Sequence, residues 1–260
     1  MILNELTQLY LALLISLLLG AGFLHLTAKS GELGRKISDF FCYAPGIDLA
    51  LGYFMLIPLI VGFSFSGGLG IGIALLAELS ALWVWIILHE LTHPVAKSEK
   101  IHSTLSGIVG GWRNHLAVWI TGLAIPVFWV VRFAELIVYP PLTWLIRLPK
   151  YEGKDWVNVS RQKFEGLVGY DLIWCLYCDW MTGVWSLGTE MLRNVESFWC
   201  PIRFYSEKKC ANCQIDFPDI DNGWVSATGT MKDVTNVLAE KYTTDQEERS
   251  WFGHGDRKNQ

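Results

Sequence analysis

Residues 81–94, ALWVWIILHELTHP, decide the fold, because an apolar helix runs here directly into a polar motif. They close an apolar run from Leu69 to His93 that is long enough to cross the roughly 30 Å core of a bilayer. Residues four apart share one face of a helix, so His89 and His93 can present two imidazoles to one metal ion. Glu90 lies beside the first histidine. The stretch therefore predicts a membrane helix that ends in a candidate metal site.

Other apolar runs predict further spans. Gln8–Ala28 has no charged side chain and is interpreted as an uncleaved anchor, and Asp48–Phe65 predicts a second span. The turn at Ser66-Gly67-Gly68 would join the second span to Leu69–His93 as a hairpin. The run Leu116–Leu148 is divided by prolines and is too long for one helix. It would form either one span followed by an interfacial helix or a re-entrant hairpin.

Basic residues predict the orientation. We expect polar loops at residues 29–45 and 97–113, each with three basic residues, and the positive-inside rule places both in the cytoplasm. More basic residues follow Leu148, which favours the re-entrant hairpin and a cytoplasmic C-terminal part. The fold class expected is mainly α, with three to four membrane spans. The expected domains are a transmembrane part (1–150), a Cys-rich and Trp-rich soluble or interfacial part (151–242) and a charged tail (243–260).

The motif His89-Glu90-Leu91-Thr92-His93 has the H-E-x-x-H pattern. It resembles the zinc-binding helix of zinc metallopeptidases, most closely the membrane-embedded site-2-protease and CaaX-processing types. The resemblance implies zinc on His89 and His93, with Glu90 as the general base that activates water. A third ligand is not evident. The candidates by chemistry are His102, His115, Glu135 and Asp171.

Two other interpretations of the histidines stay open. The pair could lie at the headgroup level and bind lipid phosphate, a partner or each other. His89, His93, His102 and His115 could instead belong to a di-iron oxygenase resembling fatty-acid desaturases. His25 is interpreted as a packed or interfacial residue. Glu78 lies two to three turns from His89, too far to share its ion, and is expected to pair with Arg132.

The cysteines form a second constellation. Two C-x-x-C pairs can hold zinc or an iron–sulfur cluster, and a fifth cysteine lies between them. Reduced structural thiols and disulfides are the alternatives. Cys42 is expected to be an inert buried residue. The candidate metal ligands of this constellation are Cys175, Cys178, Cys200, Cys210 and Cys213.

The rest of the C-terminal part predicts two helices. Phe164–Asn194 is expected to lie against the membrane or under the domain, and Thr230 is expected to cap an amphipathic helix from Met231 to Tyr242. The net charge of −4 disfavours nucleic acid as a partner. The expected partners are the lipid bilayer and other membrane subunits. Two functions are predicted as alternatives: a membrane metal-binding protein that acts as a zinc hydrolase or peptidase through Glu90, or a non-catalytic membrane scaffold or subunit whose cysteine site docks a partner.

Overall fold

The computed structural model describes residues 2–93, 100–209 and 223–249, and in these ranges the chain is mainly α-helical. The only β-pairing among the described residues is two isolated bridges. Three helical stretches are long and apolar enough to cross a membrane: Leu3–Lys29, Gly46–Thr92 and Gly111–Ile146. These stretches confirm the expected fold class and indicate an integral membrane protein.

The chain forms two compact units that interleave along the sequence. The first comprises Met1–Ile125 and Gly153–Gly183, and the second comprises Pro126–Glu152 and Val184–Gln260. The long helix α10 (Gly169–Trp199) contributes to both units. Each unit is described below by itself.

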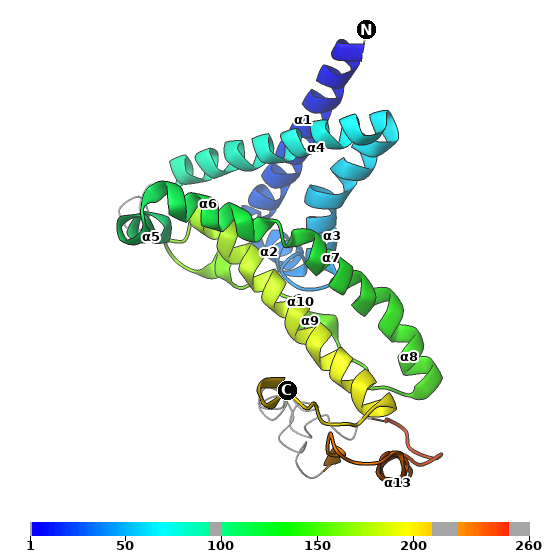
Figure 1. Ribbon diagram of the computed structural model, residues 1–260. Coiled ribbons are helices and arrows are strands. Elements are labelled where there is room, and N and C mark those ends of the chain that lie inside the picture. Colours follow the sequence, from blue (N-terminus) through cyan, green and yellow to red (C-terminus); the bar gives the residue numbers. More distant parts are fainter. Residues whose placement is uncertain (1, 94–99, 210–222, 250–260) are drawn as a thin grey trace. The chain divides into compact units, whose positions relative to one another are not determined.

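The second candidate span doubles back as a hairpin, as the sequence predicts (Figure 1). It begins with α3 (Gly46–Leu51) and a π-helical turn, η1 (Gly52–Leu56), and continues in α4 (Ile57–Thr92). Ser66 and Gly67 leave helical geometry, and Gly67 has a φ of +56°, which glycine adopts at little cost. The bend divides the 47-residue stretch into two limbs of roughly 30–40 Å at about 1.5 Å per residue. Each limb is therefore long enough to cross a bilayer core.

Small residues bring the helices of the first unit together. Gly62 and Gly70 face each other across the hairpin so closely that a Cβ on either would meet the other's backbone. The helix α1 (Ile2–Lys29) packs its leucines Leu9 and Leu13 against the buried alanines Ala74 and Ala77 of the second limb. Such small side chains allow the close helix approach on which packing within a bilayer depends.

Polar contacts fix the register of α1 against both limbs of the hairpin. The Tyr10 hydroxyl donates to Ser80 Oγ at 2.9 Å, and the hydroxyls of Ser16 and Tyr53 lie 2.8 Å apart. Tyr10 contacts Ser80, and His25, further along α1, lies near His89 and His93, further along α4, so the two helices run in the same direction. The C-terminal end of α1 therefore lies at the C-terminal end of α4.

Two stretches expected to be loops contain helices. The helix α2 (Gly31–Phe40) occupies the first, where Glu32 and Lys36 form an i,i+4 ion pair at 3.3 Å. The helix α5 (Ile101–Val109) occupies most of the second. The polar side chains of both segments resemble those of loops, although apolar residues at helical spacing with polar residues between them are typical of a helix with one apolar face.

The remaining parts of the first unit pack around α10. The helix α6 (Gly111–Gly122) opens the third span, while α9 (Gly153–Trp156) and the 3₁₀ turn η4 (Arg161–Lys163) precede α10. Gly183 of α10 allows this close approach, because a Cβ there would meet the backbone of Trp156. The expected helix at 164–194 is confirmed, although it begins and ends about five residues later.

The second unit joins the end of the third span to the rest of α10. The helix α7 (Ile125–Phe133), the π-helical turn η3 (Ala134–Val138) and α8 (Tyr139–Ile146) follow one another along the chain. Arg132 donates to Glu135 at 2.6 Å, and both side chains are buried. Arg132 thus has a carboxylate partner on its own span, and the expected pairing with Glu78 stays a prediction.

The second unit also contains the predicted amphipathic helix. It is α13 (Met231–Lys241), and Thr230 accepts from the Asp233 amide while the Asp233 carboxylate accepts from the Thr230 amide. This capping box confirms the expected start of the helix, and Val234 is its buried apolar residue.

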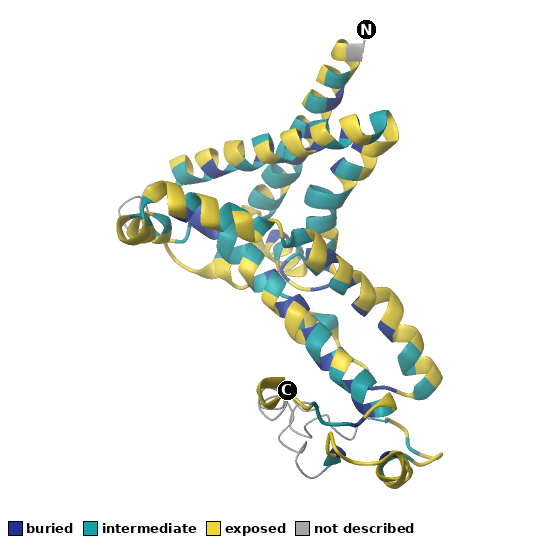
Figure 2. Cartoon of the chain, viewed as in Figure 1, coloured by how far each residue is buried: buried dark blue, intermediate teal, exposed yellow. Residues whose placement is uncertain are grey.

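Exposed residues recur along all three candidate spans (Figure 2), and many of them are large and apolar. Examples are Ile15, Phe63, Leu88 and Val130. A water-soluble protein rarely exposes so much contiguous apolar surface, whereas lipid tails would cover it in a bilayer. The burial pattern therefore agrees with contact between these helices and lipid.

Candidate functional site

Three imidazoles gather in the first unit. His25 lies near the end of α1, and His89 and His93 lie one turn apart at the end of α4. The ring centroids of His89 and His93 are 4.3 Å apart, and that of His25 is 6.1 Å from the first and 6.0 Å from the second. The parallel packing of α1 on α4 produces this group, because it brings the ends of both helices together.

Hydrogen bonds fix the tautomer of each histidine of the pair. His93 Nδ1 lies 2.9 Å from the carbonyl oxygen of His89. A carbonyl oxygen only accepts, so Nδ1 of His93 carries the proton and its Nε2 keeps a lone pair. The Gly169 amide lies 3.3 Å from His89 Nδ1 and donates to it, so neutral His89 carries its proton on Nε2. Only one of the two Nε2 atoms is thus ready to bind an ion.

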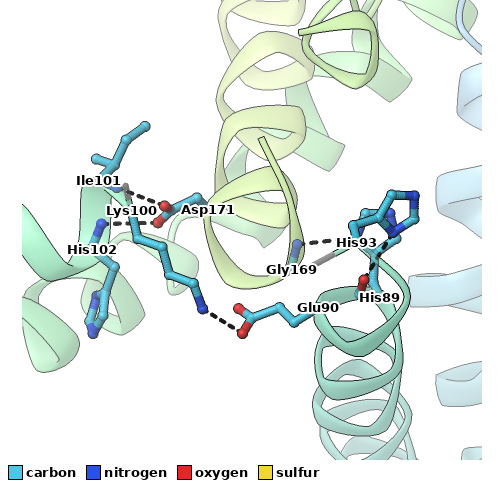
Figure 3. A network of polar contacts seen from close by, with 8 residues as sticks. All are labelled: His89, Glu90, His93, Lys100, Ile101, His102, Gly169 and Asp171. Carbon is cyan, nitrogen blue, oxygen red and sulfur yellow. Dashed lines mark hydrogen bonds and ion pairs between the residues drawn. The ribbon is translucent and has the colours of Figure 1, made fainter. Parts of the chain in front are cut away.

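Glu90 is held away from the imidazoles. Its Oε2 lies 2.5 Å from the ammonium nitrogen of Lys100, and Figure 3 shows the carboxylate extending toward Lys100 on the side opposite the histidine rings. Gly169 packs directly against this side chain, so that a Cβ at Gly169 would overlap it. The glutamate of the motif is therefore an ion-pair partner in this structure.

Asp171 binds the start of α5. Its two carboxylate oxygens accept from the amides of Ile101 and His102 at 2.8 and 3.0 Å (Figure 3). The first amides of a helix have no partner within the helix, and a carboxylate there also interacts favourably with the helix dipole. Asp171 was one of the candidate third ligands, and the structure gives both its oxygens this capping role.

The other candidate third ligands also have partners elsewhere. Asn114 Nδ2 lies 3.1 Å from His102 Nδ1. Trp119 donates its indole N–H to His115 Nε2 at 3.0 Å, and the Tyr170 hydroxyl lies 3.3 Å from His115 Nδ1. The fourth candidate, Glu135, forms its ion pair in the second unit. His25, which the sequence analysis interprets as a packed or interfacial residue and not as a ligand, has its ring centroid within 6.1 Å of both histidines of the pair.

The side-chain conformations in the described part of the chain do not form a metal-ligand set. Within residues 2–93, 100–209 and 223–249, no group of three or more His, Cys, Asp or Glu side chains is placed to hold an ion. The imidazole rings of the pair lie stacked, with an interplanar angle of 18°, and Trp85 stacks on the other side of His89 at 4.6 Å. Rotation of at least one ring would be needed before the three histidines could share an ion.

The described cysteines are free thiols. Cys175 and Cys178 lie one turn apart on the first-unit part of α10, and Cys200 is exposed in the second unit. Burial raises the pKa of the Cys175 thiol, which disfavours the thiolate that binds metals. Cys210 and Cys213, the second C-x-x-C pair, lie outside the described residues. The cysteine site therefore stays a prediction.

The fold defines the class to which the chain belongs, an α-helical integral membrane protein. No family model, curated protein or solved structure matches it.

Proposed function

We propose that the chain is an integral membrane protein that binds a transition-metal ion, with zinc as the first candidate, through His25, His89 and His93. The observation that carries the proposal is the convergence of three imidazoles from two helices, with ring centroids 4.3–6.1 Å apart. An ion about 2.0–2.1 Å from the nitrogen of each of three tetrahedrally placed imidazoles requires centroids about 5 Å apart. The observed spacings bracket this value.

The hydrogen bonds suggest how each histidine of the pair would respond to an ion. His93 already has its Nε2 lone pair available, and the carbonyl oxygen of His89 orients its ring, as second-shell acceptors do in metal sites. His89 would have to move its proton from Nε2 to Nδ1 and lose the bond from Gly169. That bond is long, at 3.3 Å, so its loss would cost little.

Metal binding without hydrolysis is supported better than peptidase activity. A general base must be free to take a proton from metal-bound water, and the Glu90 carboxylate is paired with Lys100. Hydrolysis would require this ion pair to open and the side chain to swing around α4. A non-catalytic role, in which the bound ion stabilises the membrane part of a larger complex, does not need that rearrangement.

Elemental analysis of the detergent-purified full-length chain tests the proposal. We expect about one ion per chain in the wild type and in Glu90→Gln, and loss of the ion in His25→Gln, His89→Gln and His93→Gln. His102→Gln is the matched control, because this imidazole has its own partner in Asn114. Full metal content in His25→Gln would overturn the three-histidine site, as would a wild type that takes up no added zinc.

Cobalt substitution separates this site from the predicted cysteine site. Thiolate ligands give Co²⁺ an intense charge-transfer absorption that imidazole ligands lack. We therefore expect that replacing the histidines leaves any thiolate-to-Co²⁺ absorption of the wild type unchanged. A second ion lost on Cys210→Ser and Cys213→Ser, with the histidines intact, would instead support the cysteine constellation as an independent zinc or iron–sulfur site.

A further inference from the structure

The end of the third candidate span has the chemistry of a lipid headgroup region. The span ends at Ile146, and Trp144, in the last turn of α8, has 81% of its surface exposed. Arg147 and Lys150 follow directly, and both are exposed. Indole rings concentrate in the headgroup region of a membrane, at the boundary between lipid and water. Basic side chains concentrate there as well, because they interact with the lipid phosphates.

A cavity lies at this span end, wholly within the second unit. Its volume is about 610 Å³, and its lining includes Thr143, Trp144, Arg147 and Lys150. Arg147 has a φ of 58°, in the left-handed region, and it caps α8 where the helix ends. The cavity is large enough for a phosphate-bearing headgroup, since small-molecule sites commonly measure about 300–1,000 Å³.

An acidic part of the chain shares the cavity. Glu247 and Glu248 also line it, together with Leu148. Two hydrogen bonds hold them there, because Arg147 Nη1 donates to the carbonyl oxygen of Gln246 at 2.7 Å and the Arg249 amide donates to the carbonyl oxygen of Arg147 at 2.7 Å. Glu247 and Glu248 thus line the same cavity as the two cations, and their negative charges reduce its positive potential.

We propose that this cavity binds the phosphate of an anionic phospholipid headgroup through Arg147 and Lys150, and that the segment carrying Glu247 and Glu248 competes with the lipid. The position at a span end and the exposed indole favour lipid over a free anion, because both would keep the phosphate at headgroup level. Like charges repel, so the phosphate binds more tightly when the two carboxylates are neutralised or withdrawn. The segment is then an autoinhibitory contact that a lipid of sufficient negative charge displaces.

The test measures lipid retained by the full-length chain. The protein is reconstituted in vesicles of phosphatidylcholine with phosphatidylglycerol, extracted into neutral detergent, and its bound lipid is determined by native mass spectrometry. We expect preferential retention of phosphatidylglycerol, reduced by about fivefold for each charge removed in Arg147→Gln and Lys150→Gln. Glu247→Gln combined with Glu248→Gln should raise retention in the same measurement. Lys150→Gln is the more informative basic variant, because it leaves the Arg147 contact with Gln246 in place.

Matched controls make the result decisive. Lys208→Gln and Lys232→Gln remove exposed positive charges of the same unit away from the cavity lining, and we expect no change in retention. Equal loss in these variants would overturn the proposal, because binding would then follow net charge alone. Retention unchanged by Lys150→Gln would also overturn it. Displacement of phosphatidylglycerol by millimolar inorganic phosphate would show a free-anion site and would overturn the assignment to lipid.

Discussion

Gly169 donates its backbone N–H to Nδ1 of His89 at 3.3 Å, and through this contact the start of α10 sets the tautomer of a histidine on α4. The same glycine has a φ of +58° and leaves room for the Glu90 side chain. One residue thus fixes a proton on the imidazole and leaves space for the ion pair next to it. Few other residue types could occupy this position, because a Cβ would be strained in its conformation and would overlap Glu90.

Gly169→Ala should destabilise the protein more than Gly166→Ala. Both glycines have positive φ values, so alanine should cost about 1–2 kcal/mol of backbone strain at either position. Only at Gly169 would the new methyl group also overlap a side chain, since the space at Gly166 is open. Thermal unfolding in detergent measures the difference. Equal shifts of Tm for the two variants would contradict the packing described around Glu90.

The ion pair between Glu90 and Lys100 should show measurable coupling. A double-mutant cycle with Glu90→Gln and Lys100→Met removes each partner alone and then both. Both side chains are 24% exposed, so we expect a coupling energy of about 1 kcal/mol in the free energy of unfolding, well below that of a buried pair. Coupling near zero would mean that solvent separates the pair, and Glu90 would then be available as the base of a hydrolase.

Asp171→Asn should expose the start of α5 to hydrogen exchange. The carboxylate accepts from two amides, and a hydrogen bond to a charged acceptor contributes about 1.5–3 kcal/mol. We expect the amides of Ile101 and His102 to exchange at least about tenfold faster in the variant. Asp155→Asn, at an exposed position of the same unit, is the control and should leave both amides unchanged.

The sequence predicts the membrane helices well, because apolar length is a local property. The hairpin at Ser66-Gly67-Gly68 could be predicted from turn residues between two apolar runs. The capped helix α13 was equally predictable, since Thr230 and Asp233 make their contacts within one turn. The helices α2 and α5 were missed. Asp171, 70 residues away in the sequence from Ile101, accepts from the first amides of α5. The residues of α5 themselves do not indicate that a distant carboxylate caps this helix.

The candidate site shows the same division between local and distant contacts. The spacing of His89 and His93 predicts two imidazoles on one face, and the structure places their centroids 4.3 Å apart. The approach of His25 depends on α1 and the second limb of α4 running in the same direction, which the sequence of neither helix specifies. The pairing of Glu90 with Lys100 likewise depends on where α5 returns to α4. A motif of five residues could not predict either contact.

Cys42 should react slowly with iodoacetamide, and the pH dependence should reveal why. Burial raises the pKa of its thiol, so at pH 7–8 the reactive thiolate is scarcer than in an ordinary cysteine. The rate should therefore keep rising with pH above the ordinary thiol pKa of about 8.5. Mass spectrometry of alkylated peptides compares it with exposed Cys200 in the same sample. Equal rates at neutral pH would show that Cys42 is accessible in solution.

Gly70→Ala should loosen the hairpin of α4, whereas Gly72→Ala should not. A Cβ at Gly70 would meet the backbone carbonyl of Gly62, which cannot rotate out of the way as a side chain can, so the two limbs must separate. At Gly72 nothing lies within 4 Å of the added Cβ, and alanine there should stabilise the helix by about 0.5–1 kcal/mol. A disulfide engineered between the two limbs near the bend should accordingly form more slowly in Gly70→Ala than in Gly72→Ala. If both variants cross-linked at the wild-type rate, the close approach of Gly62 and Gly70 would be contradicted, and with it the hairpin geometry that brings α4 against α1.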